Sequence, residues 1–189
     1  MNIQLKKISY SLTASHFKEK LIFRDFSLDI NRDTNFSITK VLLPNNYGKS
    51  SLLKLMAGII KPSSGEVVVS SDIKKIVYIP SLPATFNFAT VEQNIEHILS
   101  FAELKLADVK DEYKTLVEIS DLSGYEDHRP DPLSFGFRFR IMIIASILAG
   151  AQCILLDDIF SLLDSPTASE LKELIEILAE KYSTWFIEV

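Results

Sequence analysis

Cysteine is nearly absent from this chain: among 189 residues, only Cys153 carries a thiol. No internal disulfide can form, and because Cys153 stands in an apolar run we expect it to be an inert core residue. Long apolar runs are missing as well, since the richest one, residues 141–151, is shorter than the roughly 20 residues that cross a bilayer. The N-terminal stretch "MNIQLKKISY" lacks the apolar core and cleavage site of a signal peptide. We therefore expect a cytoplasmic chain.

An excess of positive charge is also absent. The chain has 20 Lys and Arg against 25 Asp and Glu, a net charge of −5, which disfavours nucleic acid as the main partner because phosphate backbones are bound by basic surfaces. The histidines, His16, His97 and His128, lack the spacing of metal ligands, so we expect them on the surface. What is present, 47% hydrophobic residues with 12 Phe, fits one domain with a sizeable aromatic core.

The hydrophobic pattern predicts alternating strands and helices. Strands are expected over 2–12 and 20–30 as a hairpin, then over 35–43, in "GEVVVS", over 74–79, in "CILLDD" and in "STWFIEV". Helices are expected directly after residue 50 and over about 91–102, 106–120, 134–149 and 166–181. Helix ends are signalled by Gly58 as a C-cap, by Thr90 with Gln93 as a capping box, and by Ser165 as an N-cap before Pro166.

The stretch "LLPNNYGKSS" ends like a phosphate-binding loop, G-x-x-x-x-G-K-[ST]. Gly48, Lys49 and Ser50 fit the pattern, with an expected strand before them and an apolar helix after. We expect Lys49 to contact the terminal phosphates of a nucleotide and the Ser50 hydroxyl to bind Mg²⁺. Asn46 tolerates the positive φ of a glycine, whereas Leu43 replaces the first glycine and its Cβ is expected to crowd the turn. The alternative is an ordinary strand-to-helix turn with an exposed lysine.

The second motif is "CILLDD", an apolar strand that ends in two acids. Beside a phosphate-binding loop, Asp157 suits a ligand of Mg²⁺-bound water and Asp158 would stand next to the γ-phosphate. The alternative is a helix cap or a turn.

Together these stretches resemble the nucleotide-binding domain of an ABC transporter. "LPNNYGKSS" stands where that family has GPNGSGKST, "LSFGFRFR" where it has the LSGGQ signature, and "ILLDDIFSLLD" where it has the Walker B strand and D-loop, LLLDEPTSALD. The resemblance extends over nearly the whole chain, in family order, and "LLKLMAGIIKPSSGEV" closely matches the family's continuation after the loop. It implies an α/β fold of the P-loop NTPase type, with a mixed or parallel sheet core, an N-terminal antiparallel part and a helical insertion over about 85–150, within a single domain of residues 1–189.

The resemblance also implies ATP and Mg²⁺ as ligands and assigns the site residues. The nucleotide would be bound by Asn45, Asn46, Tyr47, Gly48, Lys49, Ser50 and Ser51. Mg²⁺ would be held by Ser50 and Asp157, and Asp158 would be the catalytic acid. The signature residues would be Ser134, Phe135, Gly136 and Phe137, and Asp164 would be the D-loop contact between two such domains.

Several family positions are changed in this sequence. The glutamine of the Q-loop is Ser81, the Walker B glutamate is Asp158, and Phe135 and Phe137 replace a glycine and the glutamine of the signature. Because Asp is one methylene shorter than Glu, its carboxylate is displaced by roughly an ångström, which is enough to cost on the order of 100-fold in rate. The two phenylalanines put bulk where the γ-phosphate of a partner domain should approach.

Two further family features are changed or missing. The aromatic residue that stacks on the base corresponds to Leu12, with Tyr10 or Phe17 as substitutes, and the switch histidine would fall just past "WFIEV". We therefore expect a degenerate domain, and the alternative is ordinary drift with activity kept.

The resemblance implies two partners, a second nucleotide-binding subunit and a separate membrane permease that would hold the chain at the inner face of the membrane. Phe86 and Phe88 would contact the permease or, equally, pack within the helical block. Three functions compete: a regulatory ATP-binding subunit with poor hydrolysis, an active transport ATPase that tolerates Asp158, and a scaffold that has lost nucleotide. The cargo, the direction of transport and the choice between a homodimer and a heterodimer are not specified by the sequence.

Overall fold

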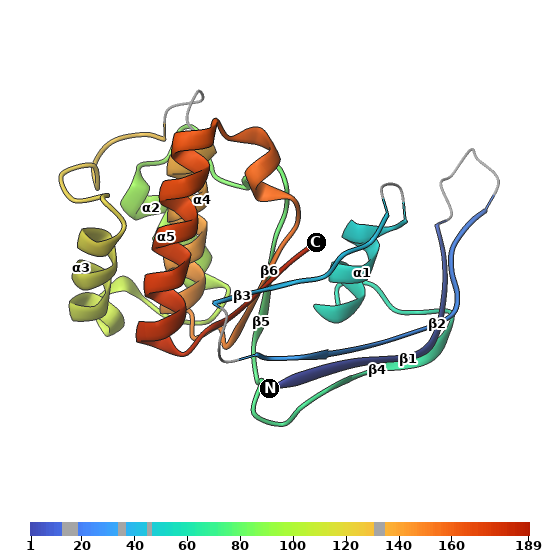
Figure 1. Ribbon diagram of the computed structural model, residues 1–189. Coiled ribbons are helices and arrows are strands. Elements are labelled where there is room, and N and C mark those ends of the chain that lie inside the picture. Colours follow the sequence, from blue (N-terminus) through green and yellow to red (C-terminus); the bar gives the residue numbers. More distant parts are fainter. Residues whose placement is uncertain (13–18, 34–36, 45–46, 131–134) are drawn as a thin grey trace.

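The computed structural model describes residues 1–12, 19–33, 37–44, 47–130 and 135–189 as two sheets and a block of helices (Figure 1). The antiparallel sheet has the order β2-β1-β4 and the parallel sheet the order β3-β7-β6-β5. The strands are β1 (Asn2–Leu12), β2 (Lys20–Asn31), β3 (Ile38–Lys40), β4 (Ser64–Val69), β5 (Ile76–Ile79), β6 (Cys153–Leu156) and β7 (Trp185–Glu188). The helices are α1 (Lys49–Met56), α2 (Val91–Ser100), α3 (Lys110–Ile119), α4 (Phe135–Leu148) and α5 (Ser165–Tyr182), with 3₁₀ turns η1 (Leu106–Val109) and η2 (Ile159–Leu162).

The predicted α/β fold class is confirmed. The N-terminal strands β1 and β2 pair antiparallel, as the hairpin prediction requires, and β4 adds to the other edge of β1. All pairs in the second sheet are parallel. The segment 85–150 contains α2, η1, α3 and α4, which stand together at one end of the molecule (Figure 1).

Alternation along β6 assigns its side chains to two different cores, because successive residues of a strand point to opposite faces. Cys153 and Leu155 pack with α1 and β1, whereas Ile154 and Leu156 pack with the helical block. The same alternation puts Trp185 of β7 on the α1 side, where its indole N–H donates to the Thr39 hydroxyl of β3 at 2.8 Å. A parallel sheet covered on both faces reads as a continuous apolar run, as "CILL" does.

Helix α4 runs through the larger core and is apolar on nearly every side. Its residues from Ile141 to Leu148 are all buried, which is what an evenly hydrophobic helix requires. Arg140, near its start, donates to the Ser120 carbonyl and forms ion pairs with Asp121 and Glu170 at 2.9 and 3.1 Å. This arginine therefore joins α4 to the end of α3 and to α5.

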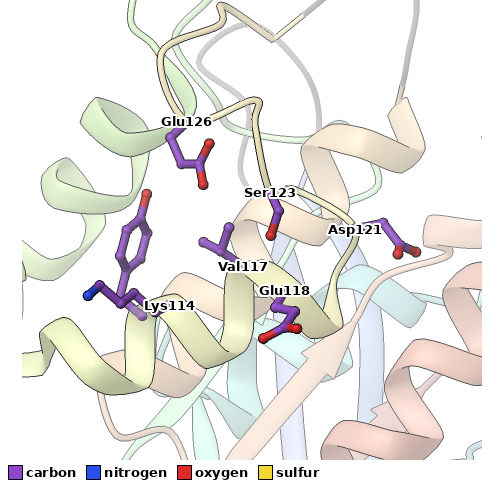
Figure 2. A pocket seen from close by; sticks show the side chains of 7 residues that line it. Lys114, Val117, Glu118, Asp121, Ser123 and Glu126 are labelled. Atoms are coloured by element: carbon purple, nitrogen blue, oxygen red, sulfur yellow. The ribbon is translucent and has the colours of Figure 1, made fainter.

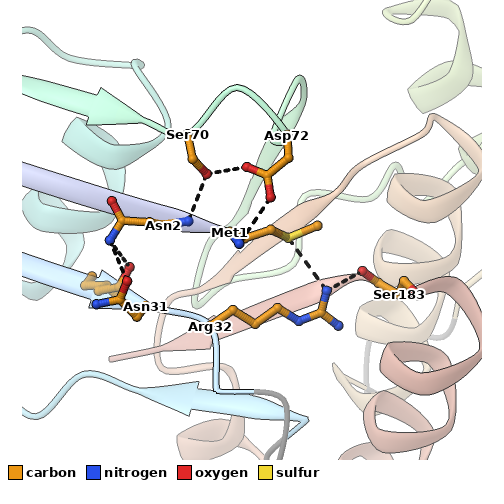
Figure 3. Close-up of polar contacts among 8 residues, drawn as sticks. Met1, Asn2, Asn31, Arg32, Ser70, Asp72 and Ser183 are labelled. Carbon is orange, nitrogen blue, oxygen red and sulfur yellow. Dashed lines mark hydrogen bonds and ion pairs between the residues drawn. The ribbon is translucent and has the colours of Figure 1, made fainter.

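A polar network fixes the antiparallel sheet against the rest of the molecule (Figure 3). The Arg32 guanidinium donates to the Ser183 carbonyl at 2.8 Å, between α5 and β7. The Met1 amine pairs with Asp72 at 3.1 Å, and Asp72 also accepts from the Ser70 hydroxyl. The start of β1 is thereby tied to the turn that follows β4.

The predicted helix ends are partly confirmed. Thr90 and Gln93 form the predicted capping box, and Gly58 takes the left-handed conformation (φ +70°) directly after the C-cap of α1. Ser165 as the N-cap of α5 was wrong. The cap is Asp164, whose carboxylate accepts from the Thr167 N–H at 3.0 Å, and a carboxylate is a strong cap acceptor.

Two predicted lengths were also wrong. The strand expected over 35–43 is Ile38–Lys40 within the described residues, because its only ladder is with β7 and closes where the Val41 N–H donates to the Glu188 carbonyl. The helix expected over 106–120 is divided into η1 and α3. The Asp108 carboxylate accepts from the Lys105 N–H and closes the 3₁₀ turn as a separate unit.

Candidate nucleotide-binding site

The turn between β3 and α1 depends on Gly48. This residue has φ +78° and is the N-cap of α1, and its carbonyl accepts from the Leu52 N–H. A Cβ at this position would lie 2.3 Å from Cγ2 of Ile22 on β2. The β2 strand therefore packs directly against the turn and leaves room for glycine only. Asn45 and Asn46, predicted for the same turn, lie outside the described residues.

Leu43, at the position of the family's first glycine, packs into the core, and the residues 45–46 that it was expected to crowd lie outside the described part of the chain. Its φ is not positive, and its side chain packs against the core formed by β1 and α1. The backbone enters the turn in an ordinary conformation and the Tyr47 N–H donates to the Pro44 carbonyl at 3.2 Å. Leu43, which stands in place of that glycine, therefore contributes to core packing in this chain.

Ser50 and Asp157, the residues predicted to hold Mg²⁺, lie together at the head of α1. The Ser50 hydroxyl donates to Oδ1 of Asp157 at 3.1 Å. The alternation along β6 points Asp157 to the α1 side, and the Asp157 N–H extends the strand ladder by donating to the Ile79 carbonyl. Asp157 is 5% exposed. Its carboxylate is therefore buried beside the turn, and its hydrogen bond with Ser50 orients it.

A third residue of this site, Tyr78, was missed by the sequence analysis. Its hydroxyl donates to Oδ2 of Asp157 at 2.6 Å, and the amino group of Lys54 lies 5.7 Å from the centre of its ring. Burial, followed by the hydrogen bond to Asp157 and its negative charge, raises the pKa of Tyr78 above its ordinary value. The phenol therefore stays a neutral donor. The available signal was a single hydroxyl in the apolar strand "IVYI", which pairs with the strand that leads to Asp157.

Asp158, the predicted catalytic acid, differs from its neighbour Asp157 in exposure and backbone conformation. It is exposed and takes a left-handed backbone conformation with φ 52°, which Asp tolerates better than most residues. Its carbonyl accepts from the N–H and the hydroxyl of Ser161. The two adjacent acids are thus divided between a buried position and a solvent-facing one.

The signature residues stand at the start of α4. Gly136 is buried, and a Cβ there would lie 2.4 Å from Cγ2 of Thr167 on α5. The Phe137 ring lies edge-on to Tyr125 with ring centres 5.5 Å apart, and both rings line a cavity of about 360 Å³ together with Gly136. Ser134 lies outside the described residues. The glycine here brings two helices into contact, and Phe135 packs against the larger core.

The carboxylate of Asp164, the predicted D-loop contact, has hydrogen-bond partners within the chain. Its carboxylate accepts from the Thr167 N–H and the Thr167 hydroxyl, both at 3.0 Å. These two hydrogen bonds, in that order, lower the pKa of Asp164 below its ordinary value. Its role as a helix cap is therefore established by geometry, and its contact with a second domain stays a prediction.

The other predicted residues form no hydrogen bond with Ser50 or Asp157 among the residues that the structure describes. Leu12 is exposed at the end of β1, and Phe17 lies outside the described residues. His97 and His128 are exposed, and the described residues contain no cluster that could hold a metal ion through His, Cys, Asp and Glu. Cys153 is fully buried, as predicted, and burial raises the pKa of its thiol to about 12.

An aromatic surface patch lies on the loop before α2 and on α2 itself. Phe88 and Phe101 are 73% and 79% exposed, and Phe86 contacts both Phe88 and His97 with ring centres 5.3 and 4.7 Å apart. The buried amide of Asn94 fixes the loop by bonding to the N–H and carbonyl of Phe86 and to the carbonyls of Ala89 and Thr90. We call Phe86, Phe88, His97 and Phe101 the aromatic patch. The sequence analysis missed His97 and Phe101 as members.

A second cavity lies between α3 and the loop that follows it (Figure 2). It has a volume of about 510 Å³ and includes Tyr113, Glu118, Asp121 and Glu126 among its lining residues. None of the predicted site residues that the structure describes lines it. Among the described residues, no helix is long and apolar enough to cross a membrane.

The geometry of the site by itself indicates a class of protein. A parallel strand, a turn that needs glycine, and a helix whose Ser50 hydroxyl meets the buried Asp157 at the end of another parallel strand, β6, are the features of a P-loop fold.

Comparison with known proteins narrows this class to one family. The model of the ABC transporter family matches residues 23–161. The aliphatic sulfonates import ATP-binding protein SsuB of Bacillus cereus is 33% identical over 175 residues, which cover 86% of this chain and 68% of that protein. The chain therefore belongs to the ABC transporter family, as a nucleotide-binding domain.

Solved structures share the fold. The structure of cbiO1 from Clostridium perfringens, part of the ABC transporter complex cbiONQ, has a TM-score of 0.78 at 20% identity over 98% of this chain and 76% of that one. A dimeric ATP-binding cassette in a post-hydrolysis state, bound to ADP and Pi, has a TM-score of 0.75 at 20% identity over 99% of this chain and 87% of that one.

Proposed function

We propose that this chain is an ATP-binding subunit of an ABC-type transport complex that binds ATP with Mg²⁺ at the head of α1 and hydrolyses it poorly. The observation that carries the proposal is the contact between Ser50 and Asp157 at 3.1 Å. A hydroxyl and a carboxylate at the head of a helix are the donor set that holds Mg²⁺ and its water beside a bound phosphate.

Different residues at the head of α1 contact different parts of the nucleotide. Backbone N–H groups from Gly48 to Ser51 bind phosphate oxygens, with the favourable potential of the helix N-terminus. Lys49 adds a positive charge at the terminal phosphates. When bound, Mg²⁺ neutralises charge between phosphate oxygens. Ser50 and Asp157 are the residues that hold it.

Poor hydrolysis follows from the position of Asp158. A water-positioning acid must be held within a fraction of an ångström of its working geometry. Asp158 is short, exposed and in a left-handed conformation, and the family's Q-loop glutamine is Ser81. These features support binding with slow turnover.

The residues at the start of α4 support the proposal that the signature motif of this chain contacts a partner's nucleotide poorly. Gly136 is used for contact with Thr167, and Phe137 is held against Tyr125, so neither is presented for a partner's phosphate. We therefore propose that the chain works with a second nucleotide-binding subunit, as a heterodimer or a structural homodimer. The dimeric cassette with the same fold supports such pairing.

The aromatic patch is the proposed contact with a separate permease. Phe88 and Phe101 are largely exposed, and the buried Asn94 holds the loop of Phe86 and Phe88 in place. The patch is therefore a preformed apolar surface of the kind that marks interaction sites. This contact would place the chain at the inner face of the membrane.

The deciding experiment is calorimetric titration of the purified chain with ATP and Mg²⁺. We expect binding in the micromolar range that Lys49→Ala abolishes and that Lys61→Ala leaves unchanged, because Lys61 is an exposed lysine just beyond α1. Turnover that Lys49→Ala removes would instead favour an active ATPase. No binding at millimolar ATP would contradict the proposal and favour the scaffold.

A further inference from the structure

Both oxygens of the Asp157 carboxylate have partners, and the two partners differ. Oδ1 accepts from Ser50 at 3.1 Å, and Oδ2 accepts from Tyr78 at 2.6 Å. Ser50 belongs to the first turn of α1, at the proposed nucleotide site. Tyr78 belongs to β5, which stands on the far side of Asp157 and is fixed in register, with Tyr78 opposite Leu155.

We infer that Tyr78 is a positioning residue that holds the Asp157 carboxylate with Oδ1 directed at the Mg²⁺ position. The inference rests on the proposed function, because it concerns the same nucleotide site. The carboxylate can rotate about its Cβ–Cγ bond, and a hydrogen bond to one oxygen fixes the direction of the other. Tyr78 is suited to this task because its strand is rigidly paired and its ring is packed against the α1 core.

Burial explains why the phenol matters. Asp157 is 5% exposed, so without Tyr78 its Oδ2 would be a buried acceptor with no partner. Such a group turns toward whatever donor remains. The carboxylate would then rotate about its Cβ–Cγ bond, and Oδ1 would lose its fixed direction toward the Mg²⁺ position.

The test separates orientation from folding by a ratio of affinities. The dissociation constant of ATP is measured by calorimetry in EDTA and again in saturating Mg²⁺, and the ratio of the two values is the gain due to the metal. Outer-sphere partners of metal ligands are worth about 10- to 100-fold in metal affinity. We expect Tyr78→Phe to reduce the ratio about tenfold while the affinity in EDTA stays the same.

Two controls accompany this variant. Tyr182→Phe removes a phenol that donates to a carboxylate, that of Glu112, far along the chain from the turn, and should leave the ratio unchanged. Asp157→Asn should remove most of the gain from Mg²⁺. Adding Tyr78→Phe to Asp157→Asn should then change the ratio no further, since the oriented group is already gone.

The contrary results are distinct. An unchanged ratio in Tyr78→Phe, or a ratio near one in the wild type, overturns the inference and leaves ATP binding in place. An equal loss of affinity with and without Mg²⁺ means that Tyr78 only supports the fold, and also overturns it. If the wild type binds no ATP under either condition, the proposed function fails and the inference fails with it.

Discussion

At the scale of single residues, Gly48 carries the clearest requirement of the candidate site. It combines a positive φ with a neighbour, Ile22, that leaves no space for a Cβ. Gly124 has a similar φ of +83°, but nothing lies within 4 Å of the place where its Cβ would be. Comparison of the two glycines therefore separates two contributions to the free energy of unfolding. One is the cost of a side chain on a left-handed backbone, and the other is the cost of its steric contact with Ile22.

We expect Gly48→Ala to destabilise the fold more than Gly124→Ala does and to abolish ATP binding. The backbone term is about 1–2 kcal/mol for each substitution, and the displaced β2 strand adds to it only at Gly48. Urea unfolding gives the stabilities and ATP titration gives the affinities. Equal losses in the two variants would mean that β2 does not constrain the turn.

The catalytic acid gives a second prediction at this scale. Asp158→Glu extends the carboxylate by one methylene and should raise the rate of ATP hydrolysis by up to about 100-fold if reach limits turnover. The left-handed backbone suits Glu less well than Asp, so a small loss of stability should accompany the gain. Steady-state phosphate release measures the rate. An unchanged rate would show that other changed positions, such as Ser81, limit hydrolysis.

At the scale of secondary-structure elements, α5 depends on Asp164 for its first turn. Because the folded pKa of Asp164 lies below its unfolded value, the ionised cap stabilises the fold above about pH 4, the unfolded pKa. That contribution is lost as the pH falls through the lowered folded pKa.

We expect Asp164→Ala to lower the melting temperature at pH 7 by about 3 °C, since cap removal costs helix stability. Asp164→Asn keeps an acceptor, so it should lose less and should make stability less dependent on pH below about pH 4. Thermal unfolding between pH 3 and 7 compares the variants. A wild-type curve parallel to that of Asp164→Asn would contradict the pKa argument.

The elements show where sequence reasoning succeeds. "CILLDD" and the apolar run that became α4 were predictable, because burial on all sides needs uniform hydrophobicity. The extent of β3 was not, because it is set by where β7 stops pairing. The cap of α5 was misplaced by one residue because Asp164 and Ser165 are both good caps, and only the geometry of Thr167 decides between them.

The residues of the candidate site were likewise predictable only in part from the sequence. Ser50 and Asp157 could be predicted because each stands in a local pattern, a turn before a helix and an acidic strand end. Tyr78 could not, because its role depends on which strand lies beside β6 and on the side to which the ring points. For the aromatic patch, the sequence singled out Phe86 and Phe88, which stand two residues apart, and left open whether they form a surface or pack inside. His97 and Phe101 join them only through α2 and its C-cap.

At the scale of the whole molecule, the proposed nucleotide site and the aromatic patch lie on different parts of the fold. The site is at the head of α1, next to the antiparallel sheet, and the patch is on the helical block (Figure 1). A change in one should therefore leave the other intact.

We expect Phe88→Ser combined with Phe101→Ser to reduce the share of the chain recovered with membranes from cells that also make its permease, and to leave ATP affinity unchanged. Removal of two exposed aromatic anchors should cost at least tenfold in association, because such residues dominate interfaces. Ile177→Ser on α5, 45% exposed in the wild type, is the matched control. Equal membrane recovery of all three proteins would assign the patch to another partner.

The buried indole of Trp185 gives the chain an optical reporter of its own. It is the only tryptophan, 1% exposed, and it bridges β7 to β3, the strand that leads into the turn. Its emission should be blue-shifted while these strands pair and should move to longer wavelength when they part. None of the substitutions described above changes Trp185, so the folding of each variant can be followed by fluorescence, without a label, in the sample used for binding.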